Sequence, residues 1–142
     1  YIEDAKKDSA VSIFAGGGSV DSKGYFVEPT ILLTTDPKSR TMVEEIFGPV
    51  LTMIPYDSEE EAIRIANDTP YGLAGYVQSG DMDHARLVAA KIRAGNIHIN
   101  GASGGADIPF GGYKQSGNGR EGGLFGLEEF LEVKAVSGWA AE

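Results

Sequence analysis

A carboxylate and an aromatic ring stand two positions apart in residues 44–50, which read EEIFGPV. The Gly-Pro pair and the apolar run that follows it place Glu45 and Phe47 at a strand entrance, where parallel sheets often bind ligands. A carboxylate can accept two hydrogen bonds from vicinal hydroxyls, and a ring can pack on a sugar or nicotinamide face. The alternative is a solvated glutamate beside a core phenylalanine, which composition alone favours.

A glycine-rich stretch, residues 117–122 (GNGREG), satisfies the G-x-G-x-x-G pattern of dinucleotide-binding folds. That mechanism requires a strand that feeds the turn and a ribose-binding acid about twenty residues later. Residues 109–116 make a poor strand, and the sequence ends before such an acid could follow. We therefore interpret residues 117–122 as a loop whose glycines permit close backbone packing.

Two other polar groups invite a functional interpretation. Residues 81–84 (DMDH) resemble part of a metal loop, but the required glycine and the later glutamate are missing, and helix capping explains both acids. His98 could serve as a base, but no serine or acid can be tied to it by sequence, so we interpret it as a core or edge histidine. With no cysteine and two histidines, the chain is expected to hold no metal.

The composition is that of an ordinary soluble globular protein, with 142 residues, 42% apolar and 23% charged. The net charge of −9 argues against nucleic acid, because affinity for phosphates comes largely from Lys and Arg. Apolar runs are too short for a membrane span, and a cytoplasmic location is expected. Because the sequence contains no cysteine, it excludes disulfides and cysteine nucleophiles from this chain, and we predict no catalytic residue in it.

Short apolar runs alternate with amphipathic helices between residues 50 and 100. Ser58 followed by Glu61 forms a capping box, which predicts a helix that ends before Pro70. The predicted strands lie at residues 50–54, 73–78 and 96–100.

A second helix is predicted between the last two of these strands. Asp81 or Asp83 caps its start, and Gly95 ends it. The β-α-β-α-β order predicts an α/β fold with one parallel sheet covered by helices on both faces.

The two ends of the chain are less regular. Residues 2–7 suit the tail of a helix, and strands are expected at residues 11–14 and 25–32, joined through a glycine turn. A short helix is predicted at residues 127–131 and a last strand at residues 132–136. No internal repeat or low-complexity linker interrupts the chain, so residues 1–142 are expected to form a single unit.

Several spaced motifs, in the same order, closely resemble the C-terminal part of the catalytic domain of NAD(P)-dependent aldehyde dehydrogenases. The resemblance covers nearly the whole chain and is carried by residues 16–18 (GGG), 25–30 (YFVEPT), 44–50 (EEIFGPV), 70–74 (PYGLA), 109–121 (PFGGYKQSGNGRE) and 132–134 (EVK). In such enzymes a cysteine thiolate attacks the aldehyde, the thiohemiacetal passes hydride to NAD or NADP, and water hydrolyses the resulting thioester.

The resemblance implies roles for individual residues. Glu45 would hold the hydroxyls of the nicotinamide ribose, and Phe47 would pack beside the ribose and the nicotinamide. For the aldehyde substrate, Phe110 would lie near the inner end of the channel, and Asn100 would begin the loop that lines it. Residues 132–142 would form an oligomerisation tail whose strand pairs with another subunit, so a homo-oligomer is expected.

The sequence departs from the family pattern in two respects. The nucleophile, the oxyanion-hole asparagine, the glutamate base and the dinucleotide-binding domain are expected upstream of Tyr1. The channel loop, residues 101–106, lacks the aromatic side chains that many relatives place there, so the sequence does not indicate which aldehyde is the substrate. The leading hypothesis is a C-terminal segment that is inactive alone. The alternatives are a stand-alone, non-catalytic oligomerisation or interaction module, and a fragment of an acyl-phosphate or semialdehyde reductase.

Overall fold

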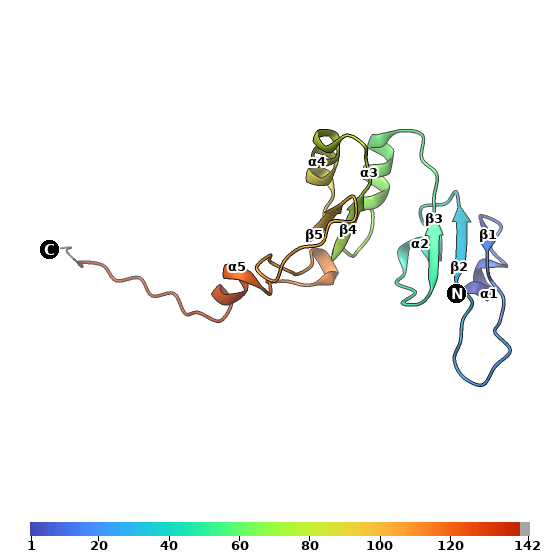
Figure 1. Cartoon of the computed structure of the whole chain (residues 1–142), viewed down its shortest axis with the longest axis horizontal. Coiled ribbons are helices and arrows are strands. Elements are labelled where there is room, and N and C mark those ends of the chain that lie inside the picture. Colours follow the sequence, from blue (N-terminus) through green and yellow to red (C-terminus); the bar gives the residue numbers. More distant parts are fainter. Residues whose placement is uncertain (140–142) are drawn as a thin grey trace. The chain divides into compact units, whose positions relative to one another are not determined.

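The computed structural model describes residues 1–139, and Figure 1 shows its helices and strands. The chain packs as two compact units, Tyr1–Thr69 and Pro70–Glu142. Both units contain helices and parallel strand pairs, which confirms the predicted α/β class. We predicted a single unit because no stretch of the sequence has the composition of a linker. For the whole protein this stays a prediction.

A three-stranded sheet with the order β1-β2-β3 forms the centre of the first unit. Its strands are β1 (Val11–Ala15), β2 (Thr30–Thr34) and β3 (Val50–Met53). The middle strand, β2, is antiparallel to β1 and parallel to β3. Successive side chains of a strand point to opposite faces, and Thr30, Leu32 and Thr34 on one face of β2 are all buried. The core of this unit therefore lies on that face.

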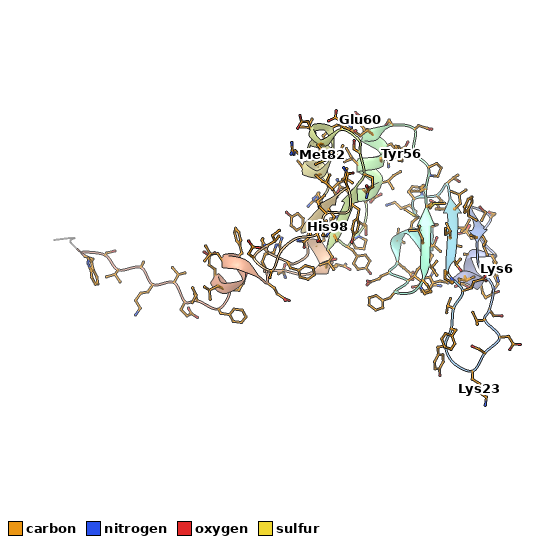
Figure 2. All side chains as sticks on the ribbon, in the orientation of Figure 1. Lys6, Lys23, Tyr56, Glu60, Met82 and His98 are labelled. Carbon is orange, nitrogen blue, oxygen red and sulfur yellow. The ribbon has the colours of Figure 1, made fainter. Side chains whose placement is uncertain are left out.

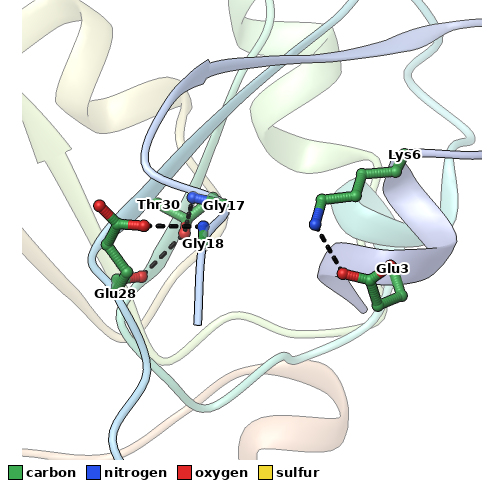
Figure 3. Close-up of polar contacts among 6 residues, drawn as sticks. All are labelled: Glu3, Lys6, Gly17, Gly18, Glu28 and Thr30. Atoms are coloured by element: carbon green, nitrogen blue, oxygen red, sulfur yellow. Dashed lines mark hydrogen bonds and ion pairs between the residues drawn. The ribbon is translucent and has the colours of Figure 1, made fainter. Parts of the chain in front are cut away.

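The loop between β1 and β2 is closed at its base by polar contacts (Figure 3). The N–H of Gly18 donates to the Glu28 carboxylate at 2.7 Å, and the N–H of Gly17 donates to Thr30 Oγ1 at 2.9 Å. The Thr30 hydroxyl donates in turn to the Glu28 carbonyl oxygen at 2.8 Å. These hydrogen bonds anchor the loop at its base, and Lys23 lies at the opposite end of the loop (Figure 2).

These contacts explain why the strand predicted over residues 25–32 begins only at Thr30. Before it, Val27 forms an isolated bridge with Ser19. Pro29 has no N–H to donate to a strand ladder, and the Glu28 side chain is bonded to the glycine turn. Regular pairing therefore cannot start earlier.

The helices of the first unit are short. They are α1 (Ile2–Ala5), α2 (Arg40–Val43) and α3 (Glu59–Asn67). The predicted capping box is confirmed, because Ser58 Oγ accepts the N–H of Glu61 at 3.2 Å. In α1, Lys6 Nζ donates to Glu3 Oε1 at 2.6 Å (Figure 3), and this hydrogen bond lowers the pKa of Glu3.

The second unit contains a two-stranded parallel sheet with a connecting helix. Its elements are β4 (Ala74–Val77), α4 (Met82–Lys91) and β5 (Asn96–Ile99), and α4 packs on both strands. Of the two predicted caps, Asp81 is the one used, because its Oδ1 accepts the N–H groups of Asp83 at 2.9 Å and His84 at 3.1 Å. The bond from His84 and then that from Asp83 lower the pKa of Asp81.

The prediction of one continuous β-α-β-α-β sheet over residues 50–100 is wrong for the part of the chain that the structure describes. β3 pairs with β2, whereas β4 pairs with β5 in a separate sheet. The alternation of strands and helices identifies the elements, but it does not show which strands share hydrogen bonds. Here the partner of β3 precedes it in the sequence.

Gly95 does not end α4, as the sequence predicted, because the helix stops at Lys91. Its N–H instead donates to the carbonyl oxygen of Gly72 at 3.0 Å. A Cβ at this position would overlap the carbonyl oxygen of Gly111. Gly95 is therefore required for the close approach of two backbone segments.

After β5 the chain forms a 3-10 helix, η1 (Lys114–Ser116), and α5 (Gly123–Glu128). The helix predicted at residues 127–131 thus begins and ends earlier than expected. Residues 132–136 form no strand within the described chain, where no segment pairs with them. A strand needs such a hydrogen-bonded partner. Residues 140–142 of the predicted oligomerisation tail lie outside the described residues.

Candidate functional site

The turn between α2 and β3 presents the two residues that the sequence singled out. Glu45 and Phe47 are both exposed, and both line a groove of about 360 Å³. The Phe47 ring is 93% exposed, so the alternative of a core phenylalanine does not hold for this chain. A carboxylate and an uncovered ring at one groove can hold a ligand that offers hydroxyls and a flat face.

The backbone of this turn is strained at Phe47, where φ is +53°. A residue with a Cβ rarely adopts this left-handed conformation, and a bulky aromatic residue pays a steric cost there. Such strain persists only where the flanking structure holds it, and it often marks a functional site. On the β3 side, the N–H of Val50 donates to the Gly48 carbonyl oxygen at 2.7 Å, and Thr30 of β2 donates to the Pro49 carbonyl oxygen at 2.9 Å.

On the α2 side, the turn begins at Glu44, which stands in a network of charged and aromatic groups. Glu44 Oε2 accepts the hydroxyl of Tyr1 at 2.6 Å and Arg40 Nε at 3.0 Å. These two hydrogen bonds, Tyr1 first, lower the pKa of Glu44. The same bond from Tyr1 to Glu44 raises the pKa of Tyr1. The charged form of this carboxylate is therefore stabilised by Tyr1 and Arg40.

Asn100 follows β5 and also has a left-handed backbone, with φ at +51°. Its carboxamide forms a pair of hydrogen bonds with the backbone of Ser79, because Oδ1 accepts the Ser79 N–H and Nδ2 donates to the Ser79 carbonyl oxygen, both at 2.9 Å. Nδ2 also contacts Met82 Sδ at 3.4 Å. The side chain of Asn100 is thus already engaged by the segment between β4 and α4.

Phe110 is half-exposed and forms an antiparallel bridge with Glu121, in which each N–H donates to the other carbonyl oxygen at 2.7 Å. Phe110 lines a hollow of about 340 Å³ together with Arg120. The glycine pattern at residues 117–122 lies in this region, and η1 precedes it rather than a strand. Arg120 Nη1 donates to the carbonyl oxygen of Gly112 at 3.1 Å, which agrees with a packed loop.

His98 lies in β5 (Figure 2), and its ring stacks on Tyr76 of β4 with 5.1 Å between centroids. Its Nδ1 stands 2.8 Å from the Ala102 carbonyl oxygen. Both contacts fit the interpretation of a structural histidine. Within residues 1–139, no cluster of three or more His, Cys, Asp or Glu side chains is arranged to bind a metal ion. Nor does that stretch contain a helix with the length and apolarity that crossing a membrane demands.

The structure brings Glu45 and Phe47 together at one groove, whereas Asn100 and Phe110 have separate partners in the second unit. Sequence reasoning missed the hydrogen bonds of the Asn100 side chain. A signal for the backbone was present, since Asn followed by Gly is typical of positions with positive φ. No comparable signal marks the contact between Tyr1 and Glu44, which are 43 positions apart.

Comparison with known proteins assigns this α/β chain to a family. The model of the aldehyde dehydrogenase family matches residues 1–136. The chain therefore belongs to the aldehyde dehydrogenase family, as the motifs had indicated.

Individual relatives agree with this assignment. A 3-succinoylsemialdehyde-pyridine dehydrogenase from Pseudomonas sp. is 51% identical over 140 residues, which are 97% of this chain and 29% of that enzyme. Among solved structures, the chain is similar to a mutant of aldehyde dehydrogenase C from Pseudomonas syringae in complex with NAD⁺ and octanal. That similarity has a TM-score of 0.91 and 46% identity, and it covers 99% of this chain and 30% of the other.

A Mycobacterium tuberculosis aldehyde dehydrogenase in complex with NAD⁺ matches with a TM-score of 0.89 and 41% identity, over 99% of this chain and 30% of that protein. The chain thus spans about 30% of the length of the relatives that it matches.

Proposed function

We propose that this chain is the C-terminal part of the catalytic domain of an NAD- or NADP-dependent aldehyde dehydrogenase. The complete enzyme oxidises an aldehyde to a carboxylate through a cysteine thiohemiacetal. The chain has no cysteine, so the nucleophile is supplied by another part of the protein and the chain alone is inactive. Membership of the family, the 30% share of the relatives' length and the NAD⁺ complexes of two similar structures support this proposal.

The observation that carries the proposal is the exposed pair of Glu45 and Phe47 at one groove. The Glu45 carboxylate would accept hydrogen bonds from the two hydroxyls of the nicotinamide ribose, and the Phe47 ring would pack beside the ribose and the nicotinamide. When bound, NAD or NADP would supply the acceptor for the hydride. Both residues restrict the position of the nicotinamide, and orientation of this kind can supply a large part of a rate enhancement.

For the substrate, we propose that Phe110 lies near the inner end of the aldehyde channel and that Asn100 begins the loop that lines it. The half-exposed ring of Phe110 at a hollow is consistent with an apolar contact. Because the carboxamide of Asn100 is bonded to Ser79, Asn100 acts on the aldehyde through the position of the loop rather than through a direct hydrogen bond. Which aldehyde is oxidised depends on residues of the whole enzyme.

The decisive experiment is Glu45→Gln in the full-length enzyme. Loss of a charged hydrogen-bonding partner is expected to weaken cofactor binding or the transition state for hydride transfer by about 1.5–3 kcal/mol. Cofactor affinity is measured by fluorescence titration, and hydride transfer by single-turnover kinetics. Glu60→Gln in α3 is the matched control, since Glu60 is another exposed glutamate of the first unit (Figure 2). Unchanged affinity together with an unchanged hydride-transfer rate would refute the role of Glu45.

The inactivity of the isolated chain is tested separately. The purified chain is incubated with propanal and either NAD⁺ or NADP⁺, and no reduced cofactor is expected, because removal of a nucleophile costs many orders of magnitude in rate. Turnover above the background of a heat-denatured sample contradicts the proposal.

The apolar side chains on the C-terminal segment bear on a second candidate function, a stand-alone oligomerisation or interaction module. Phe130, Val133 and Trp139 are all more than four-fifths exposed, at 88%, 96% and 83%. Surfaces of this kind promote association. In analytical ultracentrifugation, association of the isolated chain supports the fragment, whereas a 15.0 kDa monomer that unfolds cooperatively favours the module. For the whole enzyme we propose a homo-oligomer and, from its composition, a cytoplasmic location.

A further inference from the structure

The turn that presents Glu45 and Phe47 follows α2, a helix with little stability of its own. α2 has four residues, Arg40–Val43, and Ser39 at its start provides no side-chain capping bond. Isolated helices of this length do not persist in water. The direction in which the chain leaves α2 must therefore be set by contacts outside the helix.

The strained backbone at Phe47 also requires contacts from outside the turn to hold it. The left-handed backbone is held on its β3 side by the bonds to the carbonyl oxygens of Gly48 and Pro49. A strained turn that is anchored at one end can relax through the other end. The turn keeps its shape only if the α2 side is anchored as well.

The contacts of the Glu44 carboxylate supply this second anchor. Glu44 Oε2 accepts from Tyr1 at 2.6 Å and from Arg40 Nε at 3.0 Å, so one carboxylate oxygen joins the start of the chain to α2. The Arg40 guanidinium also donates through Nη1 to Asp4 at 2.5 Å and stacks over the Tyr1 ring, with 4.3 Å from Cζ to the centroid. Arg40 thus reaches Glu44, Asp4 and Tyr1 at once, which no single exposed ion pair does.

We infer that Glu44 is a positioning residue for the cofactor: with Arg40 and Tyr1 it fixes the α2 side of the turn and so aims the Glu45 carboxylate and the Phe47 ring. The inference rests on the proposed function of Glu45 and Phe47. All members of the network are exposed, so its loss changes the global stability little. Its effect falls on the local geometry of the turn, and it is therefore visible in cofactor binding.

The test uses the full-length enzyme and the variants Glu44→Gln, Arg40→Gln and the double variant, with Glu60→Gln as the control and Glu45→Gln as the reference. The dissociation constant of NADH or NADPH, whichever the wild-type enzyme binds more tightly, is measured by fluorescence. The KM values for the oxidised cofactor and for the aldehyde are measured in parallel. Each single variant is expected to weaken cofactor binding by roughly two- to fivefold, the upper part of the range for exposed charge pairs. The aldehyde KM and the control remain unchanged.

Two further readouts separate positioning from a general loss of structure. Because Glu44 and Arg40 belong to one network, the loss of cofactor affinity in the double variant is expected to be smaller than the sum of the losses in the two single variants. At 1 M NaCl the affinity of the wild-type enzyme is expected to approach that of Glu44→Gln, since exposed charge pairs are screened. If Glu44→Gln does not fold, Arg40→Gln carries the test alone.

The outcomes distinguish this inference from the proposed function. If Glu45→Gln weakens cofactor binding and both Glu44→Gln and Arg40→Gln leave it within twofold of wild type, the positioning role is overturned and the proposed function stands. If Glu45→Gln also leaves binding unchanged, the proposed function fails. A parallel rise in the KM values for cofactor and aldehyde overturns the positioning role, because it indicates a general disturbance.

Discussion

The two units of this chain are held together in different ways. The first unit has a central strand whose alternate side chains are fully enclosed, so its core consists of side-chain volume around Leu32. The second unit has a two-stranded sheet, and its buried apolar side chains are small, namely Val77, Ala85 and Ala94. Its segments are joined backbone to backbone at glycines. The stability of the first unit should therefore suffer most from substitutions that leave a cavity. The stability of the second unit should suffer most from a methyl group added at a glycine.

The largest effect is expected from Gly95→Ala in the second unit. The new Cβ would overlap the carbonyl oxygen of Gly111, and neither backbone segment can give way cheaply. We expect a loss of about 4 kcal/mol or more in the free energy of unfolding of the full-length protein, measured by denaturant titration. Gly80→Ala is the matched control, because no atom lies within 4 Å of its Cβ position. Equal stability of the two variants contradicts the proposed backbone packing.

Leu32→Ala tests the other half of the comparison. Leu32 is completely buried, so its truncation leaves a cavity and is expected to cost about 2–5 kcal/mol in the free energy of unfolding. Leu51→Ala in β3 of the same sheet serves as the control, because that side chain is 57% exposed. A cost for Leu51→Ala as large as that for Leu32→Ala would show that the core of the first unit lies elsewhere.

Asn100 allows backbone strain and side-chain bonding to be separated within the second unit. Asn100→Gly keeps a backbone suited to φ +51° but loses both bonds to Ser79, and a cost of about 1 kcal/mol in unfolding free energy is expected. Asn100→Ala loses the same bonds and also strains the backbone, which adds about 1–2 kcal/mol. The difference between the two variants is measured by thermal and denaturant unfolding. Equal stability would mean that the left-handed backbone carries no strain here.

The smallest effect is a pH dependence in the first unit. The folded-state pKa of Glu44 is lowered from its ordinary value of 4.5. The stabilisation by its hydrogen bonds is therefore complete above pH 4.5 and is lost as the pH falls through the lower folded-state value. In unfolding measurements between pH 7 and pH 3, the difference between wild type and Glu44→Gln is expected to shrink toward the acid end. A difference that stays constant over this range excludes a charged Glu44 as its source.

Local features were the most predictable part of the structure. The capping box of Ser58 and Glu61 was predicted correctly because both partners lie within one helical turn. Its physics is contained in four consecutive residues. The α/β class followed from the alternation of apolar runs and amphipathic helices, for the same reason.

Features that depend on distant partners were not predictable. The pairing of β3 with β2 instead of β4, and the packing of Gly95 against Gly111, depend on contacts between segments that are not neighbours in the sequence. At the candidate site, the pattern of residues 44–50 indicated Glu45 and Phe47. The partners of Glu44 are Tyr1, which precedes α1, and Arg40 in α2, and the motif gives no sign of either. A motif shows which side chains are presented, but not which other residues hold the motif in place.

The carbonyl oxygen of Gly72 has a consequence for the exchange of amide hydrogens with solvent. This oxygen accepts the N–H of Gly95 at 3.0 Å and also the N–H of Tyr113 at 2.8 Å. Any fluctuation that withdraws Gly72 releases both amides at once, although they belong to segments on either side of β5. Amides that are released by one local opening exchange as a cooperative unit. Gly95 and Tyr113 should therefore exchange with deuterium at matched opening free energies, and so report the movement of the Gly72 carbonyl group, which has no exchangeable hydrogen.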